Sequence, residues 1–362
     1  MTTQKKINEH ALSLHRKAVV IDMHSDVHLD VVRARGRGET RVLERRHLPN
    51  WKTGGVDMVV LNTIPRFSPT PYPYATSPVK NTLLIFDAVL QEIAESPRHF
   101  TLILEPPDIL RAKKEGKIGL MLGIEGAEAV EDNIGLLRAY HRLGLRVMNL
   151  TWHQRNLAAD GVAEPSNAGL SNFGRELVRE MNRLGILIDV SHLAPAGVAD
   201  VLRLSDAPVM ASHSNVKAVR DHERNLDDNQ IMDITSKGGM IGVVFLGRFV
   251  AEKNPTLEHV INHIDHIAGL AGGRHIGIGP DYTDYAEDMV IGARRIAGPN
   301  QPVNDATIPY AKGLENASKL PNLTKGLAQR GYDDKTIADI LGGNFLDLFT
   351  TIRSKVNARK EY

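Results

Sequence analysis

Histidine and carboxylate side chains directly follow several short apolar runs in this sequence. The first run ends in D-M-H-S-D, and later runs end in I-E-G, D-V-S-H, A-S-H-S and G-I-G-P-D. Imidazole and carboxylate groups bind zinc and similar divalent ions, and the absence of cysteine leaves no thiolate for that purpose. The candidate ligands are His24, Asp26, Glu125, His192, His213 and Asp281.

The number and spacing of these groups favour two metal ions over one. His24 and Asp26 stand two positions apart, so at the end of a strand their side chains point to the same side and can bind one cation. The full set exceeds what a single tetrahedral catalytic zinc needs, whereas a two-metal site uses it with one carboxylate as a bridge. One such residue alone would more often cap a loop, so the prediction depends on all of them meeting in one place.

The apolar runs before these groups are predicted to be strands of a parallel sheet. They are rich in Val, Ile, Leu and Met with little polar alternation, which is typical of strands buried on both faces. Segments with helical spacing lie between most of them, and several end at a glycine such as Gly144, Gly185 or Gly238. The expected strands are 18–23, 56–62, 118–124, 146–150, 186–190, 209–211, 240–245 and 276–278, and the expected helices are 81–94, 134–143, 172–184, 195–204, 230–237 and 257–270.

This alternation predicts an α/β fold, a (β/α)8 TIM-type barrel that residues 1–362 form as a single domain. In such a barrel the carboxyl ends of the strands converge on one mouth, where active sites are built. An open doubly wound sheet is the alternative, and 102–114 is either a helix or the approach to the third strand. Loops are expected at 67–79 and, after strand eight, at 284–320, followed by C-terminal helices at 324–330, 334–341 and 344–356.

Composition narrows the classes of partner. The formal net charge is +1, from 44 basic and 43 acidic residues, which gives no reason to expect nucleic acid or a membrane surface. The N-terminal residues M-T-T-Q-K-K are polar and lack the apolar core of a signal peptide. We therefore expect a cytoplasmic protein without membrane segments.

Taken in order, the motifs H-x-D, I-E-G, D-V-S-H, S-H-S and G-I-G-P-D make the chain resemble the renal (membrane) dipeptidase family of zinc peptidases, in the amidohydrolase superfamily. The resemblance extends to E-N-A-S-K-L-P-N-L-T-K-G-L and G-G-N-F-L near the C-terminus. It implies two zinc ions per chain: His24 and Asp26 hold one, His192 and His213 hold the other, and Glu125 bridges both. It also implies that Asp281 is the catalytic acid/base.

The residues expected to bind the substrate differ from the family pattern at one position. Arg224, in E-R-N-L, matches the arginine that binds the substrate carboxylate. The family carries a histidine in an L-T-H motif that contacts the substrate and the tetrahedral intermediate, but the sequence here is L-T-W-H. An ungapped match places Trp152 there, and we expect His153 to point elsewhere unless the loop shifts. Arg155 is a further candidate for the same contact.

The resemblance implies a zinc-dependent dipeptidase that cleaves dipeptides, L-Xaa-D-Xaa included, by a hydroxide bridging the two metals. A small peptide is the expected substrate, and the family suggests a homodimer. Two alternatives stay open: hydrolysis of an N-acyl amino acid or a β-lactam on the same site, and a non-peptidase relative recruited to a biosynthetic pathway. The Trp152 departure favours the last, whereas the complete ligand set opposes it.

A run of arginines follows the first strand. We expect a solvated loop there, and the alternative is that some of these arginines steer an anionic substrate towards the mouth. The residues are Arg33, Arg35, Arg37, Arg41, Arg45 and Arg46.

Overall fold

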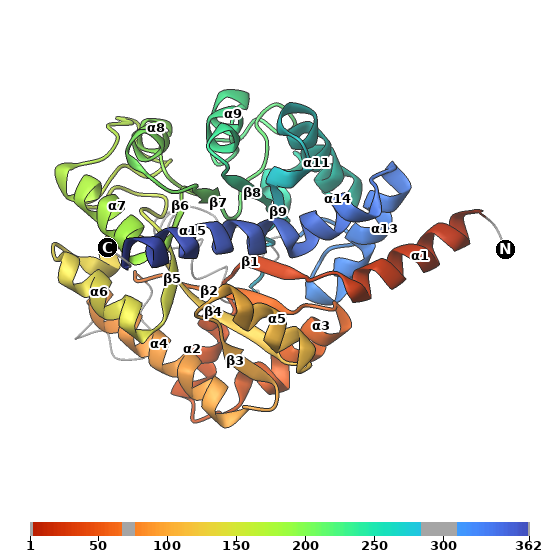
Figure 1. Cartoon of the computed structure of the whole chain (residues 1–362), viewed down its shortest axis with the longest axis horizontal. Coiled ribbons are helices and arrows are strands. Elements are labelled where there is room, and N and C mark those ends of the chain that lie inside the picture. Colours follow the sequence, from red (N-terminus) through yellow and green to blue (C-terminus); the bar gives the residue numbers. More distant parts are fainter. Residues whose placement is uncertain (1–2, 67–76, 284–309, 361–362) are drawn as a thin grey trace.

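Parallel strands form a barrel surrounded by helices in the computed structural model, which describes residues 3–66, 77–283 and 310–360 (Figure 1). Each predicted strand overlaps an observed one, and every pairing between neighbours is parallel, so the predicted fold class is confirmed. In hydrogen-bonding order the strands are β1 (Ile21–Ser25), β2 (Met58–Thr63), β4 (Ile118–Glu125), β5 (Leu145–Asn149), β6 (Leu187–Asp189), β7 (Met210–Ala211), β8 (Met240–Val243) and β9 (Ile276–Ile278).

The barrel closes between its first and last strands, just beyond the end of β9. The backbone N–H of Asp26 donates to the carbonyl of Tyr282 at 2.9 Å, and the N–H of Asp281 donates to the carbonyl of His24 at 3.1 Å. These bonds exclude the open doubly wound sheet. They also place three of the candidate site residues on adjoining stretches of the rim.

The interior of the barrel is apolar where the strands begin and polar where they end. Met121 and Glu125 stand four positions apart on β4, so both side chains face inward. Met121 belongs to an apolar cluster that also contains Phe345 and Phe349 of α15 (Asn344–Lys360). Helix α15 lies across this end of the barrel, in front in Figure 1. The closed, apolar end leaves the opposite mouth for chemistry.

The helices expected between strands are present. Gly144 and Gly185 end two of them in the left-handed conformation, with φ of 114° and 70°, as the sequence predicts. The matching helices are α4 (Pro78–Glu95), α6 (Ile134–Leu143), α7 (Asn172–Leu184), α8 (Pro195–Leu204), α9 (Asp228–Ser236), α11 (Leu257–Ala271), α13 (Leu320–Arg330) and α14 (Asp334–Ala338).

Several elements were not expected from the sequence. The segment 102–114 divides into a short strand, β3 (Phe100–Leu102), which pairs with the start of β4, and helix α5 (Pro106–Lys114). Helices α1 (Thr3–Lys17), α2 (His28–Gly36) and α3 (Leu48–Thr53) occupy stretches for which no helix was predicted.

The basic segment after β1 is helical at residues 28–36 and 43–47, so the expectation of a solvated loop is wrong for Arg35 and Arg46, whereas Arg37 and Arg41 lie outside helices and are exposed. Arg35, in α2, donates to Glu92 at 2.6 Å and to Glu95 at 2.8 Å. Arg46 donates to Asp30 at 2.7 Å. Both arginines are neutralised by these carboxylates, which leaves them little charge with which to steer a substrate.

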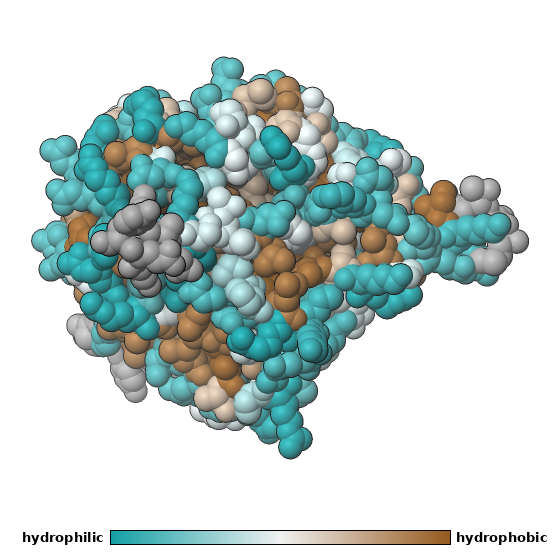
Figure 2. Space-filling model, viewed as in Figure 1, coloured by the Kyte–Doolittle hydropathy of each residue, from teal (hydrophilic) through white to brown (hydrophobic). Residues whose placement is uncertain are grey.

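Residues 67–76 and 284–309, which carry most of the two predicted loops, lie outside the described residues. Among the described helices, none is long and apolar enough to cross a membrane. The face crossed by α15 is a mixture of polar residues and smaller apolar patches (Figure 2).

Candidate metal centre and substrate site

Glu125 lies at the centre of the predicted ligands. Its Oε1 atom is 2.9 Å from His192 Nε2 and 3.4 Å from His213 Nε2, whereas its Oε2 atom is 3.6 Å from His24 Nε2. Each carboxylate oxygen therefore faces a different group of imidazoles, which is the arrangement that a bridging ligand requires.

The second group of ligands gathers around His24. Its Nε2 atom lies 3.7 Å from Asp26 Oδ1 and 3.7 Å from Asp281 Oδ1. One ligand atom from each of His24, Asp26 and Glu125 can be chosen so that all lie within 4.8 Å of one another, and the same holds for Glu125, His192 and His213. The structure thus brings together all six candidates, which come from five separate strand ends.

An irregularity in β1 turns His24 towards the interior. Ile21 pairs with Met58 and Ser25 pairs with Leu61, so β1 has one residue more than β2 between these two pairs. Met58 belongs to the interior cluster and Leu61 to the cluster outside the sheet, so Ser25 faces outward and its neighbour His24 faces inward. Without the extra residue, His24 would lie on the outer face, opposite to Ile21.

The donor set fits divalent cations. His192 Nε2 and His213 Nε2 lie 2.8 Å apart, and both are close to the carboxylate of Glu125. Among the described residues, the buried atoms His24 Nε2 and Asp26 Oδ1 have no hydrogen-bond partner. Buried polar atoms are almost always paired, so this cluster of unpaired acceptors points to a ligand that the protein itself does not supply.

The hydroxyl of Ser212 contacts Nδ1 of two candidate ligands and favours one tautomer of His213. Its hydroxyl donates to Asp189, and it lies 2.8 Å from His213 Nδ1 and 3.2 Å from His24 Nδ1. Because the hydroxyl hydrogen is directed to Asp189, a lone pair of the Ser212 oxygen can accept from Nδ1–H of His213. Nε2 of His213 is then left with a free lone pair, as a metal ligand needs.

Sequence reasoning did not single out these supporting residues. Asp189 ends β6 and Ser212 follows β7, so the rule that found the ligands, their position at a strand end, also marks them. Asn62, near the end of β2, is a third case, with Nδ2 at 2.8 Å from His24 Nδ1. Ser212 and Asn62 contact Nδ1 of an imidazole and Asp189 accepts from Ser212, and the sequence reveals none of these contacts.

The pKa values of the histidines differ between the two groups of candidate ligands, because burial dominates in one group and nearby carboxylates dominate in the other. Burial lowers the pKa of His192 and of His213 well below the usual range, which favours neutral imidazoles. Burial also acts to lower the pKa of His24, but the carboxylates of Glu125, Asp281 and Asp26 overcome it and raise that pKa to about 10. A cation among these carboxylates would take the place of the proton on His24.

Asp281 and His192 both adopt left-handed backbone conformations, with φ of 63° and 66°. Such values are uncommon for residues other than glycine and recur at functional sites. Burial, partly offset by His24, raises the pKa of the Asp281 carboxyl to about 6. A carboxyl group that titrates near neutral pH can both accept and deliver a proton.

His153 lies beside the candidate ligand His192, contrary to the expectation that it would point elsewhere. Its ring centre is 4.6 Å from that of His192, and the residue is 8% exposed. The chain bends at residues 152–154 after β5 has ended, so strand alternation no longer governs direction there. Trp152 lies further away, with its ring centre 6.4 Å from that of His192.

Arg155 is not part of this site. Its Nε donates to Asp160 Oδ1 at 2.5 Å and its Nη2 donates to Asp160 Oδ2 at 3.2 Å. Its Nη2 also donates to the hydroxyl of Ser166. The guanidinium group thus forms its hydrogen bonds within the loop that follows β5.

Arg224 is buried next to the candidate ligands His192 and His213. Its Nη2 donates to the backbone carbonyl of His213 at 3.0 Å, and Nη1 donates to Ser214 Oγ at 3.4 Å. The Nε atom has no hydrogen-bond partner among the described residues. A cavity of about 20 Å³, with room for about one water, is lined by Arg224, His192 and Ser214 among others. The guanidinium group therefore has an N–H group that can still donate a hydrogen bond to an anionic ligand.

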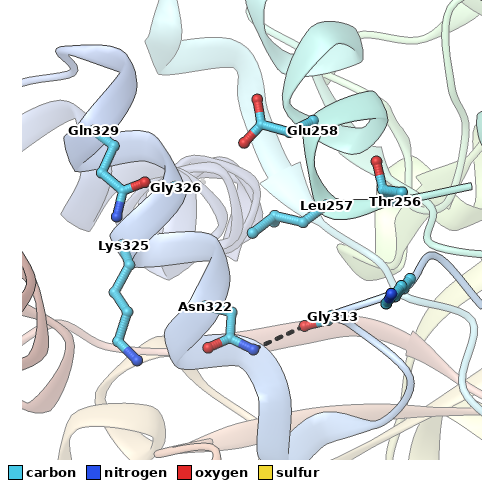
Figure 3. A pocket seen from close by; sticks show the side chains of 9 residues that line it. Thr256, Leu257, Glu258, Gly313, Asn322, Lys325, Gly326 and Gln329 are labelled. Carbon is cyan, nitrogen blue, oxygen red and sulfur yellow. Dashed lines mark hydrogen bonds between the residues drawn. The ribbon is translucent and has the colours of Figure 1, made fainter.

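A larger hollow of about 370 Å³ lies elsewhere on the surface, between the start of α11 and α13 (Figure 3). Glu258, Lys325 and Gln329 line it, and Asn322 Nδ2 donates to the carbonyl of Gly313 at 3.0 Å. No candidate ligand lines this hollow, so it takes no part in the site.

Comparisons with known proteins agree with this geometry. The chain is 32% identical over 250 residues to Dipeptidase verJ of Clonostachys rogersoniana, which is 68% of this chain and 59% of that protein. It is 34% identical over 278 residues to an uncharacterized dipeptidase of Schizosaccharomyces pombe, which is 75% of this chain and 63% of that protein. The matched part thus spans about 60% of the length of these relatives.

Solved structures share the fold over most of both chains. A metallopeptidase from Rhodobacter sphaeroides, crystallised with a phosphinate mimic of the dipeptide L-Ala-D-Ala, is 25% identical, with a TM-score of 0.77 and coverage of 92% of this chain and 99% of its own. The probable dipeptidase PvdM of Pseudomonas aeruginosa, at 21% identity, has a TM-score of 0.81 over 97% and 99% of the two chains and supports the fold alone. The family model of the membrane dipeptidases matches residues 8–293 and 289–362. The chain therefore belongs to the membrane dipeptidase family, peptidase family M19.

Proposed function

We propose that this protein hydrolyses dipeptides at a pair of divalent metal ions, with zinc as the expected metal. The observation that carries the proposal is the position of Glu125, whose two carboxylate oxygens face separate groups of ligands. In this proposal His24 and Asp26 hold one ion, His192 and His213 hold the other, and Glu125 bridges them.

The roles of the other residues follow from their positions. When bound, the metal pair supplies an activated water and a Lewis acid for the peptide carbonyl. Asp281, next to His24, takes a proton from the attacking water and delivers it to the departing amine. Arg224 holds the terminal carboxylate of the substrate in its planar fork.

His153, rather than Trp152, is proposed for the side of the carbonyl oxygen. Burial, followed by the charges of Arg224 and Arg248, lowers the pKa of His153 to about 3. A neutral imidazole can donate one hydrogen bond to an oxygen that gains negative charge. Trp152 would then line the substrate site beside His153.

Dipeptides are proposed because the relatives carry that name and because one neighbour was solved with a mimic of L-Ala-D-Ala. Substrates of the L-Xaa-D-Xaa type are accordingly included. The homodimer and the cytoplasmic location remain predictions.

The decisive experiment combines metal analysis with a substrate panel. The purified protein is assayed for bound metal and for hydrolysis of L-Ala-L-Ala, L-Ala-D-Ala, N-acetyl-L-alanine and a β-lactam, before chelation and after chelation with zinc re-addition. About two metal ions per chain, with dipeptide cleavage that is lost and restored, is the expected result. Cleavage of the acylated amino acid or the β-lactam alone would move the substrate class to those amides, and failure to bind metal would refute the proposal.

A further inference from the structure

A second arginine stands at the barrel mouth beside Asp281. Arg248 belongs to the short helix α10 (Gly247–Val250), which follows β8, just as Asp281 follows the neighbouring strand β9. Leu246, directly before α10, forms a bridge with Tyr310, whose hydroxyl donates to the backbone carbonyl of Asp281 at 2.9 Å. The start of α10 is therefore tied to the part of the rim that carries the proposed acid/base.

The ring of Phe249 positions Arg248 relative to Arg224. The guanidinium carbon of Arg248 lies 4.6 Å from the ring centre, and that of Arg224 lies 5.5 Å from the same centre. Phe249 is 2% exposed, and its backbone carbonyl accepts hydrogen bonds from Asn215 at 3.2 Å and Asn225 at 2.9 Å. A fixed aromatic ring thus holds two cations by cation–π contacts.

The charge of Arg248 is not neutralised by the part of the protein that the structure describes. Arg248 is exposed, and it makes no hydrogen bond and no ion pair within residues 3–66, 77–283 and 310–360. By contrast, Arg155 pairs with Asp160, and Arg35 pairs with Glu92. An unpaired guanidinium group next to another cation is a binding site for an anion.

We propose that Arg248 binds the side-chain carboxylate of a dipeptide whose C-terminal residue is aspartate or glutamate, while Arg224 holds the main-chain carboxylate. This inference rests on the proposed dipeptidase function. Two carboxylates on one residue match two guanidinium groups that contact one ring. Asp281 does not fill this role, because no ion pair joins it to Arg248 within the described residues.

The test compares substrates that differ only in charge. The kcat/KM values for Ala-Glu and Ala-Gln, with the C-terminal residue in the L and in the D form, are measured for the zinc-loaded wild-type protein and for variants. We expect the wild type to prefer Ala-Glu by about tenfold or more, since a hydrogen-bonded charge pair is lost with Ala-Gln. Arg248→Gln should bring the ratio close to one, and Arg248→Glu should reverse it.

Lys253→Gln is the matched control, because Lys253 is an exposed cation five residues further along the chain and, among the described residues, forms no cation–π contact with Phe249. It should keep the wild-type ratio. A wild-type ratio near one, or a ratio that Arg248→Gln leaves unchanged, would overturn the assignment. Equal losses on both peptides would overturn it too, because Arg248 would then serve catalysis in general. If the wild type cleaves Ala-Ala but shows no charge preference, only this inference fails, whereas absence of all dipeptide cleavage refutes the proposed function and this inference with it.

Discussion

Asp281 and His192 have backbone conformations that most residues avoid, and local hydrogen bonds hold both in place. The N–H of Asp281 donates to His24, and the carbonyl of His192 accepts from Val162 at 2.7 Å. A left-handed residue with a Cβ costs about 1–2 kcal/mol, and asparagine and aspartate tolerate it better than most. Substitutions at these residues should therefore be chosen to suit the backbone as well as the side chain.

Asp281→Asn is the substitution that separates proton transfer from structure. Asparagine accepts the left-handed backbone but cannot take up a proton, so we expect bound metal to be retained and kcat to fall by about 10²–10⁴-fold. Metal analysis and steady-state kinetics on L-Ala-D-Ala measure both quantities. Turnover close to that of the wild type would remove Asp281 from the acid/base role.

Arg224→Lys tests the carboxylate clamp while keeping a positive charge. Lysine lacks the planar fork, so the KM for L-Ala-L-Ala should rise by about tenfold or more with kcat much less affected. The amide L-Ala-L-Ala-NH2 lacks the carboxylate, and the variant should handle it as the wild type does. A similar loss on both substrates would mean that Arg224 acts instead through its bond to His213.

Ser212→Ala tests whether the contact with the far side of the histidines matters for the metal site. Loss of the hydroxyl leaves Asp189 and two Nδ1 atoms without a common partner, so metal affinity should fall by about 10–100-fold. Competition with a chromophoric chelator gives the affinity. Ser25→Ala is the control, because this buried serine donates to the carbonyl of Tyr282 and its hydroxyl makes no hydrogen bond to an imidazole among the described residues.

At the scale of the elements, the region between β1 and β2 is fixed to α4 by ion pairs. Glu92 of α4 has a fully buried side chain that accepts from Arg35 at 2.6 Å and from the backbone N–H of Leu43 at 2.8 Å. Glu95, one turn later, pairs with Arg35 as well. Arg35 therefore joins α2 to α4 rather than attracting substrate.

Arg35→Ala should destabilise the fold, because it leaves the buried carboxylate of Glu92 without its cation. The expected loss in the free energy of unfolding is about 3 kcal/mol. Urea unfolding followed by circular dichroism measures it, with Arg37→Ala as the control. The side chain of Arg37 is 54% exposed, so its removal should hardly move the midpoint. Equal midpoints for the two variants would contradict the structural role of Arg35.

At the scale of the whole molecule, buried histidines outside the site connect stability to pH. His263 of α11 is fully buried, accepts from the N–H of Val216 at 3.1 Å and donates to the carbonyl of Val250 at 3.0 Å. It thereby joins α11 to α10 and to the loop after β7. Burial lowers its pKa to about 4, compared with an ordinary value of about 6.5.

The stability that neutral His263 contributes should be complete above about pH 6.5 and should decrease as the pH falls towards 4. In that window the unfolded chain binds a proton that the folded protein does not, and the total effect is about 3 kcal/mol. We expect His263→Gln, measured on chelated protein, to show a shallower loss of unfolding free energy between pH 6.5 and 4 than the wild type. Above pH 7 the two curves should run parallel, and equal slopes below pH 6.5 would exclude this role.

The sequence by itself determined the strands of the barrel and the identity of the clustered ligands. Both have the same physical reason. A strand buried on two faces must be apolar along its length, so its end is visible where polar residues such as Glu125 begin. Parallel strands then bring their ends to one mouth, whatever lies between them in sequence.

Only the tertiary structure decided the features that depend on register or on a distant partner. The extra residue in β1 that turns His24 inward depends on pairing with β2, and the direction of His153 depends on a bend beyond β5. Arg35 and Arg248 look alike in sequence, yet Arg35 pairs with a buried carboxylate of α4, whereas Arg248 lies over an aromatic ring and forms no ion pair in the described part of the chain. Whether a charge is neutralised or free depends on which side chains the fold brings beside it, and local sequence does not contain that information.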